Sequence, residues 1–203
     1  MKEVIIRKRL LQGKPFSISS ELEFLPAWWL PEAHGQTLWN ARIRRVPSAD
    51  LLEEIHELPD QDFLEWFWLK ETYEAPAEVP TILILHGLEG CAYSNYVRDL
   101  MPQLGSLGWR VVVMQYRNCG EKPNRLAQSY HAMRWQELDW TVEVLQGRFP
   151  EAPIGVVGFS IGGSILLNWL GQNEARSIVA ACAISVPYKL SPCADRLNQG
   201  FSK

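Results

Sequence analysis

The sequence predicts an α/β fold, in which a mostly parallel β-sheet carries helices on both faces. Short β-prone apolar runs alternate with segments whose apolar residues recur at helical spacing. This order favours parallel strands joined by crossover helices. Several of the runs are apolar along their whole length instead of alternating with polar residues, which is typical of strands covered on both faces.

The chain divides into two predicted parts, an irregular N-terminal arm over residues 1–50 and an α/β core over residues 51–203. In the arm, Pro26 and Pro31 flank two tryptophans. Each proline lacks a backbone donor and restricts the residue before it, so this stretch cannot form an uninterrupted helix. We therefore expect the arm to pack irregularly on the core.

The core is expected to open with a β-hairpin. Residues 51–58 and 63–69 are two strand-like runs on either side of residues 59–62. Gln61 is unusual in this turn, because a tight two-residue turn prefers glycine at a left-handed position. A longer loop therefore stays open as the alternative.

After the hairpin the sequence predicts four buried strands separated by three helices. The strands are expected at residues 81–85, 109–115, 154–159 and 178–186. The helices are expected after Ser94 as N-cap, over residues 135–149 and over residues 161–170.

Composition narrows the class of protein. The chain is 47% hydrophobic and 21% charged, as in soluble globular proteins, and its nine tryptophans are expected mostly in the core. A net charge of −3 gives no reason to expect a nucleic-acid partner. The N-terminus shows no secretory signal, and the longest apolar stretch is too short to cross a bilayer.

The four cysteines lack C-x-x-C and zinc-ligand spacing. We expect free thiols in a reducing, cytoplasmic compartment, with no metal site and no cofactor. The sequence leaves the oligomeric state open.

The segment Gly158-Phe159-Ser160-Ile161-Gly162 carries the clearest chemistry. It is a G-x-S-x-G pentapeptide between a predicted strand and a predicted helix, the context of the nucleophile elbow of α/β hydrolases. The serine is expected at positive φ in a strained turn, and its neighbours two residues away must be small so that strand and helix can approach. Ser160 is therefore the predicted nucleophile. The alternative is a glycine-rich turn with an incidental serine.

A second segment, His86-Gly87-Leu88-Glu89-Gly90, directly follows the strand predicted at residues 81–85. Acyl transfer needs two N–H donors for the oxyanion, one from the residue after the nucleophile and one from this loop. We expect Ile161 and Leu88 to supply them, with Gly87 as the alternative to Leu88. His86 is expected to orient the loop instead of acting as base, because in this fold the base follows the serine in the chain.

Further motifs, together with the two segments above, carry a specific resemblance to a known family. They are Pro26, Trp28-Trp29-Leu30-Pro31, His34, Gln36-Thr37, Leu58-Pro59-Asp60, Asp62-Phe63, Tyr116-Arg117-Asn118-Cys119-Gly120, Pro123-Asn124-Arg125, Ser185 with Pro187, and Gly200-Phe201-Ser202. With the elbow and the His86–Gly90 loop, they resemble the YheT-like branch of α/β hydrolases from about residue 24 to the last residue. The resemblance implies hydrolysis of carboxylic esters, lipid or short-chain acyl esters among them. Cys91, Ser164 and Gln61 depart from the residues usual in that branch, which bears on loop geometry and substrate preference.

The catalytic base is missing from the expected place. All four histidines, His34, His56, His86 and His131, precede Ser160. Of the two acids after Ser160, Glu174 and Asp195, we expect Asp195 to be solvated or to start a helix. The resemblance implies an acid and a histidine base beyond residue 203.

The C-terminal strands of the sheet are accordingly expected to be missing, with strand 178–186 left as an exposed edge. Residues 1–203 alone are expected to be insoluble or inert towards p-nitrophenyl esters. Two alternatives stay open: a catalytically dead α/β-hydrolase domain that acts as a binding module, and an acyltransferase or peptidase on the same scaffold.

Overall fold

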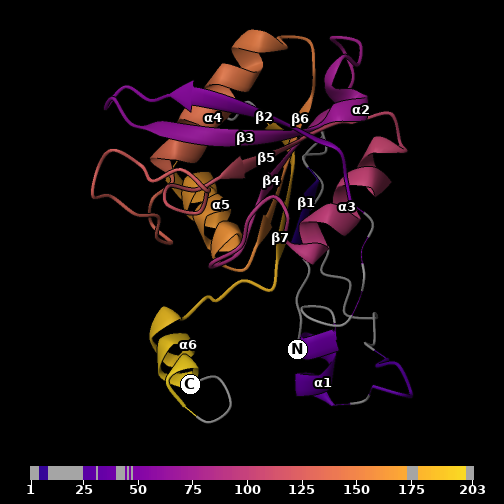
Figure 1. Ribbon diagram of the computed structural model, residues 1–203, viewed down its shortest axis with the longest axis vertical. Coiled ribbons are helices and arrows are strands. Elements are labelled where there is room, and N and C mark those ends of the chain that lie inside the picture. Colours follow the sequence, from indigo (N-terminus) through magenta and orange to yellow (C-terminus); the bar gives the residue numbers. More distant parts are fainter. Residues whose placement is uncertain are drawn as a thin grey trace.

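The computed structural model describes residues 5–8, 25–30, 32–39, 44, 46, 48–172 and 178–199. These residues form one seven-stranded sheet in the order β1-β7-β6-β4-β5-β3-β2 (Figure 1). The strands are β1 (Ile5–Lys8), β2 (Leu51–Glu57), β3 (Phe63–Leu69), β4 (Thr81–Leu85), β5 (Arg110–Gln115), β6 (Ile154–Phe159) and β7 (Ile178–Ile184). The four central strands β5, β4, β6 and β7 are parallel, whereas β3, β2 and β1 run antiparallel to their neighbours.

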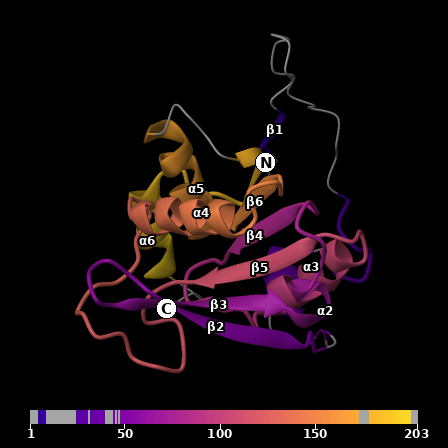
Figure 2. The same cartoon turned by 90° about the horizontal axis from the view of Figure 1, so that it is seen from above.

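Helices cover both faces of the sheet, as predicted. They are α1 (Ala33–Leu38), α2 (Lys70–Tyr73), α3 (Asn95–Gly105), α4 (Gln136–Arg148), α5 (Ile161–Gln172) and α6 (Leu190–Leu197). α4 and α5 lie together on one face and α3 lies on the other (Figure 2). The four strands and three helices predicted after the hairpin are confirmed to within a few residues at each end. The short helices α2 and α6 were not predicted.

Two apolar layers, one on each face of the sheet, form the core. Strand β3 contributes to both, because successive side chains of a strand point to opposite faces. Trp66 and Trp68 belong to the layer under α4 and α5, whereas Phe67 and Leu69 belong to the layer under α3. β3 is therefore buried on both sides along its whole length.

The tryptophans are only partly in the core. Trp66, Trp68 and Trp169 are buried, but Trp28, Trp29 and Trp39 are exposed, and the exposed fraction of Trp28 reaches 90%. The expectation of mostly core tryptophans is thus wrong for the N-terminal segment. Trp29 and Trp39 instead pack edge to face on each other, 4.8 Å between ring centroids.

The N-terminal arm is more regular than predicted. β1 pairs antiparallel with β7, and α1 forms a second regular element in the arm. Ile5 and Ile6 are β-branched residues suited to a strand, and β1 pairs with an edge of β7 that would otherwise present free N–H and C=O groups. The expectations of a fully irregular arm and of an unpaired β7 edge are therefore corrected. The division into an arm and a core remains a prediction.

The hairpin β2–β3 is closed by a loop longer than two residues. The Leu58 N–H donates to the Asp62 carbonyl at 2.8 Å, and Gln61 takes a left-handed conformation with a φ of 68°. Ser94 occupies the N-cap position of α3 as predicted, but it makes no side-chain cap. Its Oγ instead accepts the Cys91 N–H at 3.0 Å.

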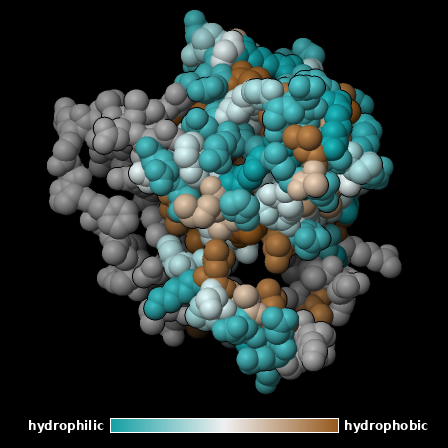
Figure 3. Space-filling model, turned by 90° about the vertical axis from the view of Figure 1, so that its left-hand side faces the viewer, coloured by the Kyte–Doolittle hydropathy of each residue, from teal (hydrophilic) through white to brown (hydrophobic). Residues whose placement is uncertain are grey.

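α6 lies away from the sheet and buries none of its side chains (Figure 1). Asp195 lies within it, exposed, and not at its start. Figure 3 shows apolar side chains at the surface between the main body and α6 below it. None of the helices that the structure describes has the length and apolar character needed to cross a membrane.

Candidate active site

Ser160 lies in the tight turn between β6 and α5. Its φ is +52°, the positive value predicted for this position, and its side chain is half-buried. The Ser160 N–H donates to the Ile184 carbonyl at 2.8 Å, which ties the turn to the end of β7. Its hydroxyl makes no hydrogen bond to any residue that the structure describes.

The glycines of the pentapeptide allow the strand and the helix to approach each other. A Cβ at Gly158 would lie 2.6 Å from the Gly162 carbonyl oxygen, and a Cβ at Gly162 would lie 2.6 Å from the carbonyl oxygens of Leu85 and His86. These neighbours are backbone atoms, which cannot rotate away. The predicted need for residues without side chains at both positions is confirmed.

The loop His86–Gly90, here called the amide loop, lies beside this turn because β4 and β6 are adjacent parallel strands. Leu85 is paired with Gly158, so the residues that follow both strands emerge at the same edge of the sheet. A Cβ at Gly87 would lie 3.4 Å from the Ser160 Cβ. The two segments singled out from the sequence are thus brought together.

His86 is fully buried, and both of its ring nitrogens are engaged. Nδ1 contacts the Gly87 carbonyl oxygen at 2.8 Å, and Nε2 accepts the Tyr116 N–H at 3.3 Å. A neutral ring protonated on Nδ1 satisfies both contacts. Burial lowers the pKa of His86 to about 4. The ring therefore stays neutral near pH 7 and is bonded to the backbone of the amide loop.

The amides of the loop differ in their partners. The Gly87 N–H donates to the Tyr96 hydroxyl at 2.8 Å, so the alternative donor considered for the oxyanion is occupied. The Leu88 N–H donates to no residue that the structure describes, and the Leu88 side chain is 53% exposed. Ile161 opens α5, and the first amides of a helix have no acceptor within it.

The other histidines have partners elsewhere. His56, on β2, packs on Trp66 with 3.8 Å between ring centroids, and its Nε2 lies 3.4 Å from a Glu54 oxygen. His131 is exposed and accepts the Met133 N–H. No histidine among the described residues is hydrogen-bonded to Ser160.

Two tyrosines that the sequence did not single out contact the amide loop. Tyr96 comes from α3, and Tyr130 comes from the segment between β5 and α4. The Tyr130 hydroxyl accepts the Glu89 N–H at 2.8 Å. No periodicity marks such contacts, because they join residues far apart in the chain. Within the described residues, no group of three or more histidine, cysteine or acidic side chains could hold a metal ion.

Known proteins are similar to this chain in sequence. A model of the family described as the alpha/beta hydrolase fold matches residues 80–203. The chain is 33% identical over 186 residues to the Escherichia coli (strain K12) protein named "Putative esterase YheT", covering 91% of this chain and 54% of that protein. It is 29% identical over 181 residues to the Mus musculus protein named phospholipase ABHD3, covering 87% of this chain and 44% of that protein. The chain thus spans about half the length of these relatives.

A solved structure supports the fold independently. The Pyrococcus furiosus esterase Pf2001 superposes with a TM-score of 0.60 at 22% identity, covering 75% of this chain and 57% of that one. The matched family model includes the amide loop, the Ser160 turn and the parallel strands that carry them. The chain therefore belongs to the α/β-hydrolase family.

Proposed function

We propose that the protein is a serine hydrolase of carboxylic esters, with Ser160 as nucleophile and the N–H groups of Leu88 and Ile161 as oxyanion donors. The observation that carries the proposal is the turn at Ser160, a half-buried serine at a φ of +52° beside a loop in which one amide has no partner among the described residues. A non-glycine residue keeps such a strained conformation only where its surroundings impose it, and such residues concentrate at functional sites.

The chemistry follows from these groups. The Ser160 Oγ attacks the ester carbonyl carbon while a base takes its proton, and the carbonyl oxygen becomes an oxyanion that accepts the two amides. Collapse of this intermediate breaks the bond between the carbonyl carbon and the alcohol oxygen. The alcohol takes up the proton and leaves, and an acyl-serine remains. Water then attacks the acyl-serine by the same route, releasing the acid and restoring Ser160.

The base is not His86, since its ring is buried, neutral and bonded at both nitrogens. We place the histidine base and its acid outside residues 1–203, in keeping with a chain that spans about half the length of its relatives. Residues 1–203 alone should then hydrolyse p-nitrophenyl esters no faster than their Ser160→Ala variant. Turnover that this variant abolishes would show that a base lies within these residues.

The substrate class is proposed from the relatives, whose names include esterase, phospholipase and monoacylglycerol lipase. Lipid or short-chain acyl esters fit these names. The half-exposed Leu88 side chain lies in the amide loop, where it could contact an apolar acyl chain. Rates on p-nitrophenyl acetate, butyrate and palmitate would rank the preferred acyl length.

A fluorophosphonate probe tests the nucleophile in the protein as its gene encodes it, because only an activated serine reacts quickly with it. We expect labelling that Ser160→Ala abolishes. Ser164→Ala is the matched control, since Ser164 lies one helical turn further on and its buried Oγ has no partner in the part of the chain that the structure describes. Labelling that persists in Ser160→Ala would refute the assignment.

A second candidate is a catalytically dead domain that binds a ligand. It is favoured by one observation, that no described histidine is hydrogen-bonded to Ser160. Absence of labelling in a folded, full-length protein would support this candidate over the hydrolase.

A further inference from the structure

We propose that Tyr96 and Tyr130 are positioning residues that clamp the amide loop so that, of the amides of Gly87, Leu88 and Glu89, only that of Leu88 faces the oxyanion. The inference rests on the proposed function and deepens it. Three successive amides carry it: Gly87 and Glu89 each donate to a tyrosine hydroxyl, whereas Leu88, between them, donates to no described residue.

Tyr96 holds the first of these amides from α3. Its hydroxyl accepts the Gly87 N–H at 2.8 Å, and its ring lies 4.8 Å from the ring of Phe159, the residue before the nucleophile. The approach needs a glycine at position 90, where a Cβ would lie 2.6 Å from the Tyr96 hydroxyl. Tyr96 therefore links the amide loop to β6, the strand that ends at Phe159.

Tyr130 holds the third amide and orders its residue. Its hydroxyl accepts the Glu89 N–H at 2.8 Å and donates to the Glu89 carboxylate at 3.1 Å. Glu89 has a φ of +52°, and these two bonds help to hold this unfavourable conformation. The Tyr130 ring stacks on Tyr116 at 4.9 Å, and Tyr116 in turn contacts the His86 ring at 4.4 Å.

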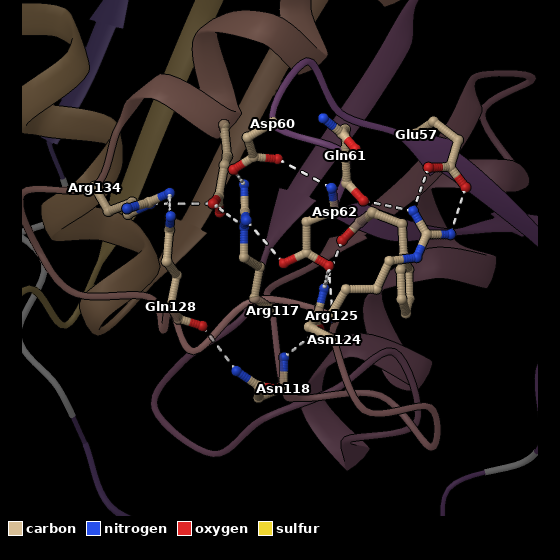
Figure 4. A network of polar contacts seen from close by, with 12 residues as sticks. Glu57, Asp60, Gln61, Asp62, Arg117, Asn118, Asn124, Arg125, Gln128 and Arg134 are labelled. Atoms are coloured by element: carbon tan, nitrogen blue, oxygen red, sulfur yellow. Dashed lines mark hydrogen bonds and ion pairs between the residues drawn. The ribbon is translucent and has the colours of Figure 1, made fainter.

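The segment that carries Tyr130 is itself fixed by a network of polar contacts around Arg117 (Figure 4). The Asn118 N–H donates to Asn124 Oδ1 at 2.7 Å, and the Asn118 side-chain amide donates to the Gln128 carbonyl at 2.8 Å. Asn124 is bonded in turn to Asp62 in the hairpin loop. The Tyr116–Gly120 and Pro123–Arg125 motifs thus have a role, because they hold the segment from which Tyr130 reaches Glu89.

Loss of either tyrosine hydroxyl should weaken binding of the transition state more than binding of the substrate. Removing one oxyanion donor costs about 10²–10³-fold in kcat, and a donor that is only misaligned should cost less, on the order of tenfold. Loss of either hydroxyl frees one neighbouring amide and lets the peptide plane at Leu88 rotate. We therefore expect Tyr96→Phe and Tyr130→Phe each to lower kcat by about tenfold with KM unchanged.

The first test uses the protein as its gene encodes it, with p-nitrophenyl butyrate as substrate and an aryl boronic acid as mimic of the tetrahedral intermediate. Tyr93→Phe is the control, because Tyr93 is 53% exposed and, among the described residues, its hydroxyl forms no hydrogen bond with the amide loop. The two clamp variants should lose boronate affinity in parallel with kcat, at an unchanged melting temperature, while the control matches the parent. Reduced kcat with full boronate affinity would overturn the clamp.

The outcomes separate the two proposals. Turnover that survives Ser160→Ala refutes the proposed function itself. Turnover that Ser160→Ala abolishes, with Tyr96→Phe and Tyr130→Phe equal to Tyr93→Phe, refutes the clamp alone.

Amide hydrogen exchange tests the clamp without activity. The Gly87 and Glu89 N–H groups should be protected in the parent and lose protection in Tyr96→Phe and Tyr130→Phe respectively. The Leu88 N–H should exchange rapidly in all three proteins. Protection of Leu88 equal to that of its neighbours in the parent would refute the inference.

Discussion

The amide loop and the network around Arg117 both contain non-glycine residues at positive φ, yet they are stabilised in different ways. Gln61 and Asn118 take such values in or beside the network, and Glu89 and Ser160 take them in and beside the amide loop. In the network the Arg117 guanidinium pairs with Asp60, Asp62 and Glu137, each N–O distance being between 2.6 and 2.8 Å. In the amide loop the amides of Gly87 and Glu89 donate to tyrosine hydroxyls, and the Leu88 amide has no partner among the described residues.

The difference indicates two purposes for strained backbone. A region whose buried polar groups are satisfied by charged partners serves to fix geometry. A region that keeps strained residues beside a hydrogen-bond donor without a partner is suited to binding a ligand through that donor. The following predictions test this contrast, beginning with the largest effect.

Arg117→Ala should destabilise the protein most. Asp62 and Glu137 are buried, and without the guanidinium their charges lose their main partner. Removing one member of a buried ion pair costs about 3–5 kcal/mol of unfolding free energy. Urea denaturation would measure the loss.

Arg125→Ala is the control for that variant, because Arg125 pairs with Glu57 on the exposed rim of the same network (Figure 4). It should lower stability far less, since exposed pairs are solvated when broken. Equal losses of stability in the two variants would mean that burial does not determine how much the Arg117 contacts stabilise the protein.

The amide loop should make stability depend on pH through His86. Its folded pKa is lowered from 6.5 to about 4, because the buried ring resists protonation. As pH falls from 6.5 towards 4, the unfolded chain takes up a proton that the folded protein does not, so stability falls across that window. At 1.36 kcal/mol per pKa unit, the full loss is about 3 kcal/mol.

His86→Gln isolates this contribution. The variant should be less stable than the parent at pH 7, but its stability should fall less between pH 7 and pH 4.5, as measured by urea denaturation at both values. A parent slope retained in His86→Gln would contradict a neutral buried ring.

The site was predictable from the sequence where its geometry is local. The β6–α5 turn follows from an apolar run, two glycines and a serine within a few residues, and the backbone contacts at Gly158 and Gly162 explain why those residues are needed. The Tyr130–Glu89 bond joins residues 41 apart in the chain, so it exists only once the sheet has formed. The pairing of β1 with β7 and the exposed Trp28 were missed for the same reason, since both depend on which surfaces the fold leaves open.

Gln61→Gly tests the strain in the hairpin loop. Gln61 is exposed at a φ of 68°. Glycine adopts this conformation without the strain of about 1–2 kcal/mol that a side chain brings. Part of this gain is lost because glycine also makes the unfolded chain more flexible. The net effect should be a stabilisation of up to about 1 kcal/mol.

Glu89→Gly relieves the same conformation at the amide loop but removes the carboxylate that Tyr130 contacts. It should therefore be stabilised less than Gln61→Gly, as judged by melting temperature. A larger gain at Glu89 would mean that its side chain contributes nothing to the loop.

Ser164→Ala should have the smallest effect, although the residue is buried next to the Ser160 turn. Its Oγ has no hydrogen-bond partner among the described residues, so alanine removes a buried polar atom without leaving another unpaired, and the change should be within about 0.5 kcal/mol. Thr72 is the matched comparison, because it is equally exposed at 6% but its Oγ1 donates to the Leu69 carbonyl and accepts the Val111 N–H. Thr72→Val leaves both partners without a hydrogen bond and should lower the free energy of unfolding by about 1–3 kcal/mol. If urea denaturation gave Ser164→Ala the larger loss, the Ser164 hydroxyl would have to be bonded to a group outside the described residues, and the space beside Ser160 would be polar.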